Sequence, residues 1–183
     1  MGWRNTEDRY GSLSVSLHWV MLFLLIAVYA CMELREFFPK GSDPRAALKT
    51  WHYILGLTVL ALVVVRLFAR WSGPTPAITP PIPAWQALSS KLVHLGLYAL
   101  MIGMPLAGWL ILSGEGDPIP FWGFELPPLT GPNESLAESL EEWHELGAEA
   151  GYWLVGLHSV AALYHHYVGR DNTLLRMLPG RTR

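Results

Sequence analysis

The sequence has few charged residues and almost no cysteine. Asp, Glu, Lys and Arg make up only 15% of the 183 residues, whereas 51% are hydrophobic, and the mean hydropathy is +0.27. The single cysteine, Cys31, excludes a disulfide within the chain. There are no repeats or low-complexity tails, and the length predicts one domain spanning 1–183. With a formal net charge of −2, we expect no nucleic-acid partner.

Charged residues are missing above all from four long stretches. The runs 14–32, 51–65 and 92–112 contain no Asp, Glu, Lys or Arg and one histidine each, and a fourth run begins near Trp143 and continues through 154–164. About 20 helical residues cross a bilayer core, and the polar stripe of soluble helices is absent here. The sequence therefore predicts an all-α, integral membrane four-helix bundle rather than a soluble bundle with an unusually apolar core. The predicted helices are 13–34, 50–70, 87–113 and 142–168.

The first of these runs resembles a secretory signal peptide, but it is longer than the usual signal core. We interpret it as an uncleaved first helix. Lysine and arginine then set the orientation. The N-terminus, the second connection with its helix ends and the C-terminus carry nine of these residues, the first connection carries four and the third carries none. The positive-inside rule predicts that both termini face the cytoplasm.

The connections differ in composition. Segment 72–84 contains five prolines, so we expect it to be extended. Segment 113–141 mixes glycine, proline and acidic residues, and we expect it to be an outer loop.

The histidines are all placed within or at the ends of the apolar runs: His18, His52, His94, His144, His158, His165 and His166. Ionisable groups inside a membrane are costly and usually mark function. The 14 residues between His144 and His158 correspond to about 21 Å along a helix and to nearly the same face. His52 lies at the depth of His144, and His18 at the depth of His158. We therefore predict two bis-histidine sites, His52 with His144 near the outer face and His18 with His158 near the inner face.

Paired imidazoles at two depths favour haem iron over other metals. Structural zinc uses four closely set ligands, often with cysteine, and a chain without Cys-x-x-Cys-His cannot attach a c-type haem. We predict two non-covalent haems b, with zinc, copper or histidines that only pack as the alternatives. Gly147, Gly151 and Gly156 lie near the histidine face of the fourth helix. They could make room for a macrocycle, although small residues also serve helix packing.

The remaining histidines and several cations lie on the inner half. We interpret His94 as a hydrogen-bonded buried histidine rather than a third ligand. His165, seven residues after His158, is predicted to contact a haem propionate or to donate a proton to a quinone, ahead of ligating iron. Arg70 is a candidate for the same propionate or quinone contacts, together with Arg66, Lys91 and Arg170. These cations could equally reflect only the topology rule.

A set of short motifs is similar to the bacterial cytochrome b561 family over nearly the whole chain. These motifs are Ser16-Leu17-His18-Trp19, Met32-Glu33-Leu34-Arg35, Phe37-Phe38-Pro39, Trp143-His144-Glu145, Gly156-Leu157-His158, Tyr164-His165-His166-Tyr167 and Asp171-Asn172-Thr173-Leu174-Leu175-Arg176-Met177. The fourth helix also resembles the cytochrome b subunits of formate dehydrogenases and nickel–iron hydrogenases. The family resemblance implies two haems b, ubiquinone as the electron acceptor and a location in the bacterial inner membrane. For the closest relatives it implies oxidation of superoxide at the outer face.

The loop charges bear on this implied substrate. Arg35, Lys40, Arg45 and Lys49 in the first outer connection could steer an anion, or they could merely balance neighbouring acids. The acidic third connection opposes such steering. One alternative is an electron-transfer subunit that accepts electrons from a partner such as a hydrogenase or formate dehydrogenase. Another is a redox-silent membrane anchor. The lack of long soluble segments for docking favours the free-standing oxidoreductase, and the oligomeric state is left open.

Overall fold

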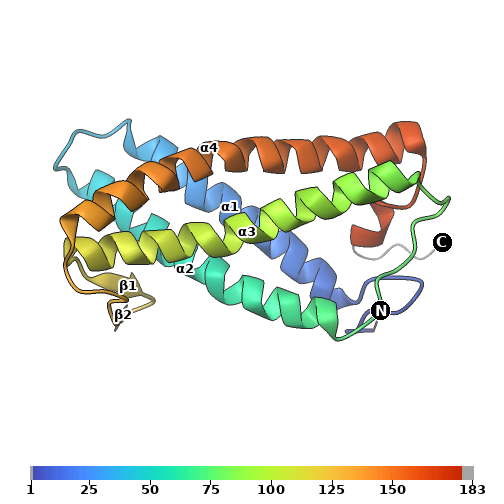
Figure 1. Cartoon of the computed structure of the whole chain (residues 1–183), viewed down its shortest axis with the longest axis horizontal. Helices are drawn as coiled ribbons and strands as arrows, with labels where there is room; N and C mark the ends of the chain where they lie inside the picture. Colours follow the sequence, from blue (N-terminus) through green and yellow to red (C-terminus); the bar gives the residue numbers. More distant parts are fainter. Residues whose placement is uncertain (1, 179–183) are drawn as a thin grey trace.

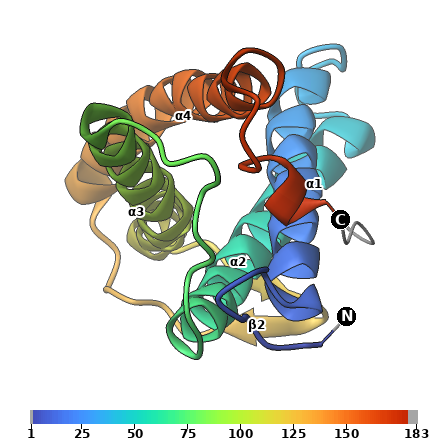
Figure 2. The ribbon, with the colours of Figure 1, turned by 90° about the vertical axis from the view of Figure 1, so that its right-hand side faces the viewer.

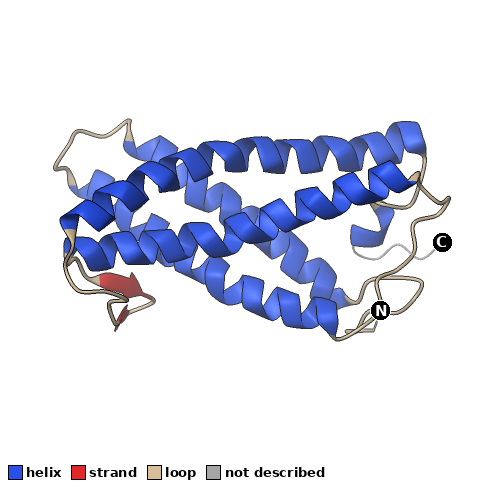
Figure 3. Ribbon diagram, in the orientation of Figure 1, coloured by secondary structure: helices blue, strands red, loops and turns tan. Residues whose placement is uncertain are grey.

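The computed structural model describes residues 2–178. Over this range the chain forms four long α-helices, a small β-hairpin and two short helical turns (Figures 1 and 3). The long helices are α1 (Ser12–Arg35), α2 (Asp43–Trp71), α3 (Ala84–Glu115) and α4 (Glu134–Tyr164). Neighbours in the chain run in opposite directions; α1 packs on α2, α2 on α3, and α3 on α4 (Figures 1 and 2).

The two ends of the bundle differ. We call the end that carries Gly2 and the C-terminal turn η2 (Leu175–Met177) the proximal end, and the opposite end the distal end (Figure 1). At the proximal end the indole nitrogen of Trp19 donates to the carbonyl of Met177 at 2.7 Å, and Arg176 donates to the carbonyl of Pro76. These bonds join the two ends of the chain and the proline-rich connection. Arg181 and Arg183, which contributed to the orientation prediction, lie outside the described residues.

Among the described residues, α1, α2 and α3 are long and apolar enough to cross a membrane, with mean hydropathies of 2.2, 2.0 and 1.9. Helix α4 is long enough but falls short in composition, because glutamates recur along its first half as far as Glu149. The chain is therefore a mostly helical, multi-pass membrane protein. The predicted fourth crossing remains a prediction, although α4 runs alongside α3 over the length of the bundle (Figure 1).

Two predicted helix starts were wrong. Helix α2 begins at Asp43 rather than at 50, because Pro44 occupies the first turn, where its missing N–H costs nothing. Helix α4 begins at Glu134 rather than at 142, because the side chain of Asn133 accepts a hydrogen bond from the backbone N–H of Leu136 and caps the helix. The α-helical part of α4 ends at Tyr164 and continues as the π-helical turn η1 (His165–Gly169).

The third connection contains the element that the all-α prediction missed. Strands β1 (Ile119–Phe121) and β2 (Phe124–Leu126) pair antiparallel through a two-residue turn. Trp122 and Gly123 in that turn have φ angles of 47° and 88°, and hairpin turns of this kind require two positive values. Ile119 is buried between Leu57 of α2 and Leu112 of α3, so the hairpin covers the distal end of the α2–α3 seam.

Candidate functional site

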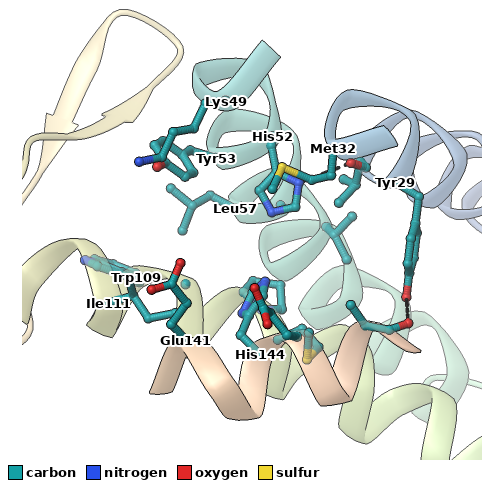
Figure 4. A pocket seen from close by; sticks show the side chains of 18 of the residues that line it. Tyr29, Met32, Lys49, His52, Tyr53, Leu57, Trp109, Ile111, Glu141 and His144 are labelled. Atoms are coloured by element: carbon teal, nitrogen blue, oxygen red, sulfur yellow. Dashed lines mark hydrogen bonds between the residues drawn. The ribbon is translucent and has the colours of Figure 1, made fainter. Parts of the chain in front are cut away.

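His52 on α2 and His144 on α4 face each other near the distal end. Their ring centres are 6.1 Å apart and their planes are inclined by 71°, and the two imidazoles point toward one another (Figure 4). Two metal–imidazole bonds of about 2 Å each, together with the distance from each nitrogen to its ring centre, require about 6 Å between ring centres. The spacing therefore fits one metal ion held between the two rings.

A cavity of about 430 Å³ surrounds this pair, with walls from all four long helices. That volume lies within the range of about 300–1,000 Å³ that is usual for cofactor pockets. Gly56 and Gly108 line it: a Cβ at Gly56 would meet no atom within 4 Å, and one at Gly108 would lie 3.5 Å from His144 Cε1. Two imidazoles and open space in a mostly apolar wall are what a haem b needs.

The hydrogen bond of His52 prepares it for ligation. Its Nδ1 lies 3.1 Å from the backbone carbonyl oxygen of Val28. A carbonyl can only accept, so Nδ1 carries the proton and Nε2 keeps the lone pair that a metal takes. Nδ1 of His144 is buried with no hydrogen-bond partner among the described residues, so no hydrogen bond fixes which of its ring nitrogens carries the proton.

The proximal half of the bundle holds a second histidine layer. His18 on α1 and His158 on α4 have ring centres 6.1 Å apart, at an angle of 64°, which repeats the distal spacing. His94 on α3 joins them, 5.3 Å from His158, and its Nδ1 lies 3.3 Å from the hydroxyl of Ser90. The structure thus brings together both predicted pairs and adds His94 to the proximal one.

Arg66 distinguishes the proximal layer from the distal one. Its Nη2 lies 3.2 Å from His18 Nδ1, and its Nη1 is buried without a partner in the described part of the chain. A guanidinium can only donate, so in this contact His18 Nδ1 accepts and Nε2 carries the proton. Ligation of iron through Nε2 therefore requires His18 to release Arg66. A released Arg66 would be available to a carboxylate such as a haem propionate.

The glycines of α4 do not all serve the expected purpose. A Cβ at Gly151 would collide with the phenol of Tyr29 and with Leu100, and one at Gly147 would collide with Met104. These two glycines admit side chains of α1 and α3 rather than leaving free space. Gly156 would meet nothing within 4 Å and is the one of the three that could leave room. Tyr29 also donates to the carbonyl of Ala148 at 2.9 Å, which joins α1 to α4 (Figure 4).

The rim of the distal cavity is acidic. Five acidic residues and two basic ones line it: Glu33, Glu115, Glu141, Glu145 and Glu149, against Arg35 and Lys49. The cations of the first connection are also partly neutralised. Arg45 and Arg35 pair with Glu36 at 2.8 and 3.1 Å, and the hydrogen bond from Arg45 holds the pKa of Glu36 below its usual range. The positive funnel suggested by the sequence is therefore weak.

A second, smaller pocket lies at the proximal end, between η1 and the proline-rich connection. Its volume is about 180 Å³, and it is lined by Pro80, Pro81, Ile82, Pro83, Gln86, Tyr164, His165, Gly169 and Asp171. His165 Nδ1 donates to Asp171 Oδ2 at 2.5 Å. Burial alone would raise the pKa of Asp171, but hydrogen bonds from Thr173 and the contact with His165 outweigh it and keep the pKa low. The carboxylate thus stays charged beside the imidazole.

Other predicted residues lie apart from this pocket. Arg70 is exposed in the last turn of α2, and among the described residues it makes no hydrogen bond or ion pair. Arg66, one turn earlier, is the cation that reaches the histidine layer. The ring of His166 meets that of Tyr167 edge to face, and His166 is not among the residues that line the proximal pocket.

The sequence matches the family model described as prokaryotic cytochrome b561 over residues 9–180, nearly the whole chain. The chain belongs to this family. Its members are membrane electron-transfer proteins that bind haem b, which agrees with the paired histidines and the distal cavity.

Named relatives match nearly the whole length of the chain. "Cytochrome b561 homolog 1" of Escherichia coli is 38% identical over 174 residues, which is 95% of this chain and 99% of that protein. "Probable superoxide oxidase CybB" of Yersinia pestis is 37% identical over 174 residues, 94% of this chain and 97% of that one. "Cytochrome b562" of Cereibacter sphaeroides is 29% identical over 181 residues, 96% and 98% of the two chains. The match to the second of these names makes the chain an oxidoreductase candidate.

Proposed function

We propose that this cytochrome b561 family member holds two haems b and transfers electrons from superoxide at its distal face to ubiquinone at its proximal face. Haem b, when bound at the two histidine pairs, supplies one-electron transfer. The observation that carries the proposal is the repeated 6.1 Å spacing of His52 with His144 and of His18 with His158. The overall reaction balances as two superoxide and one ubiquinone with two protons, giving two dioxygen and one ubiquinol.

We also propose that the chain crosses the bacterial inner membrane four times, with both termini in the cytoplasm. The support is the run of α4 along α3 and the pairing of both α4 histidines with partners on α1 and α2. Glu134 to Glu149 then project from the outer surface, and the apolar half of α4 crosses. The cation count of the connections sets the direction.

At the distal face the protein's task is to admit a small donor and to keep the ligands fixed. His52 is held by the Val28 carbonyl. Superoxide loses only an electron, so no proton donor is needed in the distal cavity. The acidic rim does not attract an anion, so superoxide reaches this cavity more slowly than it would a positively charged one.

At the proximal face ubiquinone needs protons as well as electrons. His165 lines the proximal pocket, and Asp171 accepts the hydrogen bond of its Nδ1. This bond fixes the orientation of the ring, so that in its protonated form Nε2–H can donate to a quinone oxygen while Nδ1–H stays bonded to Asp171. The pocket between Pro80 and His165 is thus our candidate for the quinone head group.

The test is to purify the full chain, determine its haem-to-protein ratio, and mix it with a superoxide generator. We expect two haems b per chain, rapid reduction of their absorption bands, and ubiquinone reduction that superoxide dismutase abolishes. A ratio of one haem, or no reduction by superoxide, would contradict the proposal.

The main competing function is that of an electron-transfer subunit for a partner enzyme. If superoxide leaves the absorption bands unchanged while a hydrogenase or formate dehydrogenase reduces them quickly, this second function replaces the first. A redox-silent membrane anchor is distinguished by spectrum alone, because purified protein would then lack haem absorption bands.

A further inference from the structure

The hairpin β1–β2 has two unlike faces. Residues paired across an antiparallel ladder point to the same side, so Ile119 with Leu126 and Phe121 with Phe124 share one face. Three of these four side chains pack against α2 and α3, while Phe124, at the turn end, is 74% exposed. The other face carries Pro120 and Glu125. Glu125 is the only charged residue between 119 and 126.

The turn of the hairpin is fixed at a defined depth on α2. The indole nitrogen of Trp122 donates to Thr58 Oγ1 at 2.9 Å, and its ring meets the edge of Trp51 at 5.9 Å between ring centres. Trp51 begins the apolar run of α2, and Thr58 lies seven residues further in, about 10 Å along the helix. Trp122 therefore spans the depth from the surface of the bilayer to its outer hydrocarbon layer.

The partner of Trp122 suits an environment without water. An indole N–H buried in hydrocarbon without a partner is costly, and Thr58 can accept it because its own hydroxyl proton goes to the carbonyl of Ile54 at 2.7 Å. Trp122 nevertheless keeps 54% of its surface exposed, and Trp51 keeps 47%. Tryptophan with one polar contact and an exposed apolar ring is the residue typical of a membrane interface.

From these contacts we propose that the hairpin tip, Trp122 with Phe124, inserts into the outer leaflet and anchors the third connection in lipid. The occupant of this surface is lipid, because the surface continues the lipid-facing side of α2 at the depth of its apolar run. Glu125 on the opposite face lies at the water side. The inserted hairpin also closes one wall of the distal cavity. Leu57 and Leu112 line that cavity, and Ile119 of the hairpin packs against both of them.

The test compares positions 124 and 125 in the full haem-loaded chain. With Cys31→Ser as background, Phe124→Cys and Glu125→Cys are each spin-labelled and reconstituted into liposomes of phosphatidylethanolamine and phosphatidylglycerol. Collision rates with oxygen, which concentrates in hydrocarbon, are compared with those of a water-soluble nickel chelate. We expect the collision rate with oxygen to exceed that with the chelate several-fold for the label at 124. For the label at 125 we expect the collision rate with the chelate to be the higher one. An unchanged haem spectrum verifies that each variant is folded.

A label at 124 that collides with the nickel chelate as often as one at 125 would overturn the proposal. So would a label at 124 that neither reagent reaches, because protein, such as a second copy of the chain, would then cover the tip. A second measurement needs no cysteine. Lipids brominated near the outer end of the acyl chain should quench less total tryptophan fluorescence in Trp122→Phe than in the wild type, and equal quenching contradicts insertion. Neither measurement depends on whether superoxide is the electron donor.

Discussion

The distal and proximal histidine layers have the same ring spacing but different surroundings. In the distal layer His52 donates to a backbone carbonyl and the pair opens into a large, mostly apolar cavity. In the proximal layer His18 accepts from Arg66, His94 adds a third ring, and the His165–Asp171 pair lies beyond. Ligand spacing is thus set by the helices, whereas the chemistry of each layer is set by the neighbouring side chains.

This contrast suggests a division of labour. The partner of His52 is a backbone carbonyl, which a side-chain movement cannot remove, so this proposed distal ligand is held in one orientation. The partner of His18 is the side chain of Arg66, which must move away before His18 can ligate iron through Nε2, so the proximal site has to rearrange when it binds haem. The proximal layer is also the one next to a candidate proton donor, where reduction of a quinone would need it.

The comparison depends first on both pairs binding haem. We expect His144→Ala and His158→Ala each to lower the content from two haems per chain to one, because each removes one of two axial ligands. Pyridine haemochrome assay against protein concentration measures the ratio. His94→Ala is the matched control and should keep both haems. Retention of two haems in either ligand variant would contradict the assignment.

The proposed proton donor belongs to the proximal side alone. We expect His165→Gln to slow ubiquinone reduction about a hundredfold, as is usual when a general acid is lost, with the haem content and the reduction of haem by superoxide unchanged. Steady-state assays with a water-soluble ubiquinone measure the effect. His166→Gln is the control and should behave as wild type. An equal loss in both variants would remove His165 from the proposal.

Asp171 should contribute to stability in a pH-dependent way. Its pKa is lowered in the folded protein, so its stabilisation is present above the ordinary value of 3.8 and is lost as pH falls through the lower folded value. Asp171→Asn should cost about 2 kcal/mol at neutral pH, as expected for hydrogen bonds to a charged group. Thermal unfolding in detergent at pH 7 and pH 3 measures this, and the difference between variant and wild type should shrink at pH 3. A pH-independent difference contradicts the expectation.

Arg66 should tune only one of the two proposed haems. Removing a cation next to His18 disfavours the reduced state, so Arg66→Gln should lower the proximal midpoint potential by about 1 kcal/mol in free energy. Spectroelectrochemical titration resolves the two potentials. Arg70→Gln, exposed one turn away, should have a smaller effect because water screens it. A shift in the midpoint potential of the distal haem alone would contradict the placement of Arg66 beside the proximal haem.

The smallest effect is expected at the distal rim. Glu141→Gln removes one negative charge from the entrance of the distal cavity, so superoxide should react about twice as fast at low ionic strength. The gain should disappear in high salt, where the charge is screened. Pulse radiolysis or stopped-flow mixing measures the rate constant. A decrease in rate would show that Glu141 has another role.

Much of this arrangement was predictable because the signals were local. The apolar runs around His18 and His94 predicted α1 and α3 to within three residues at each end, because a membrane helix is recognisable from its composition. The run around His52 predicted α2 except for its first turns, which begin at Asp43. The 14-residue interval between His144 and His158 predicted two depths, since helix geometry is regular. The start of α4 was missed because Glu134 to Glu142 read as a loop, although Asn133 is a recognisable cap.

Other features needed contacts between distant residues. Trp122-Gly123 is a weak turn signal in sequence, and only its bond to Thr58 shows where the hairpin lies. Gly151 read as space for a macrocycle, but Tyr29 fills that space, and the two residues are far apart in the chain. The sequence offered Arg66 and Arg70 together as contact residues, and only the relative rotation of α1 and α2 brings Arg66 to His18.

The sequence by itself determined that the chain is built of membrane helices with histidines at two depths, because hydrophobicity and helical repeat act over neighbouring residues. Only the tertiary structure decided which side chain each imidazole meets: a carbonyl for His52, a guanidinium for His18, a carboxylate for His165. Those partners depend on how helices rotate and tilt against one another, and that is fixed by packing across the whole bundle rather than by any one segment.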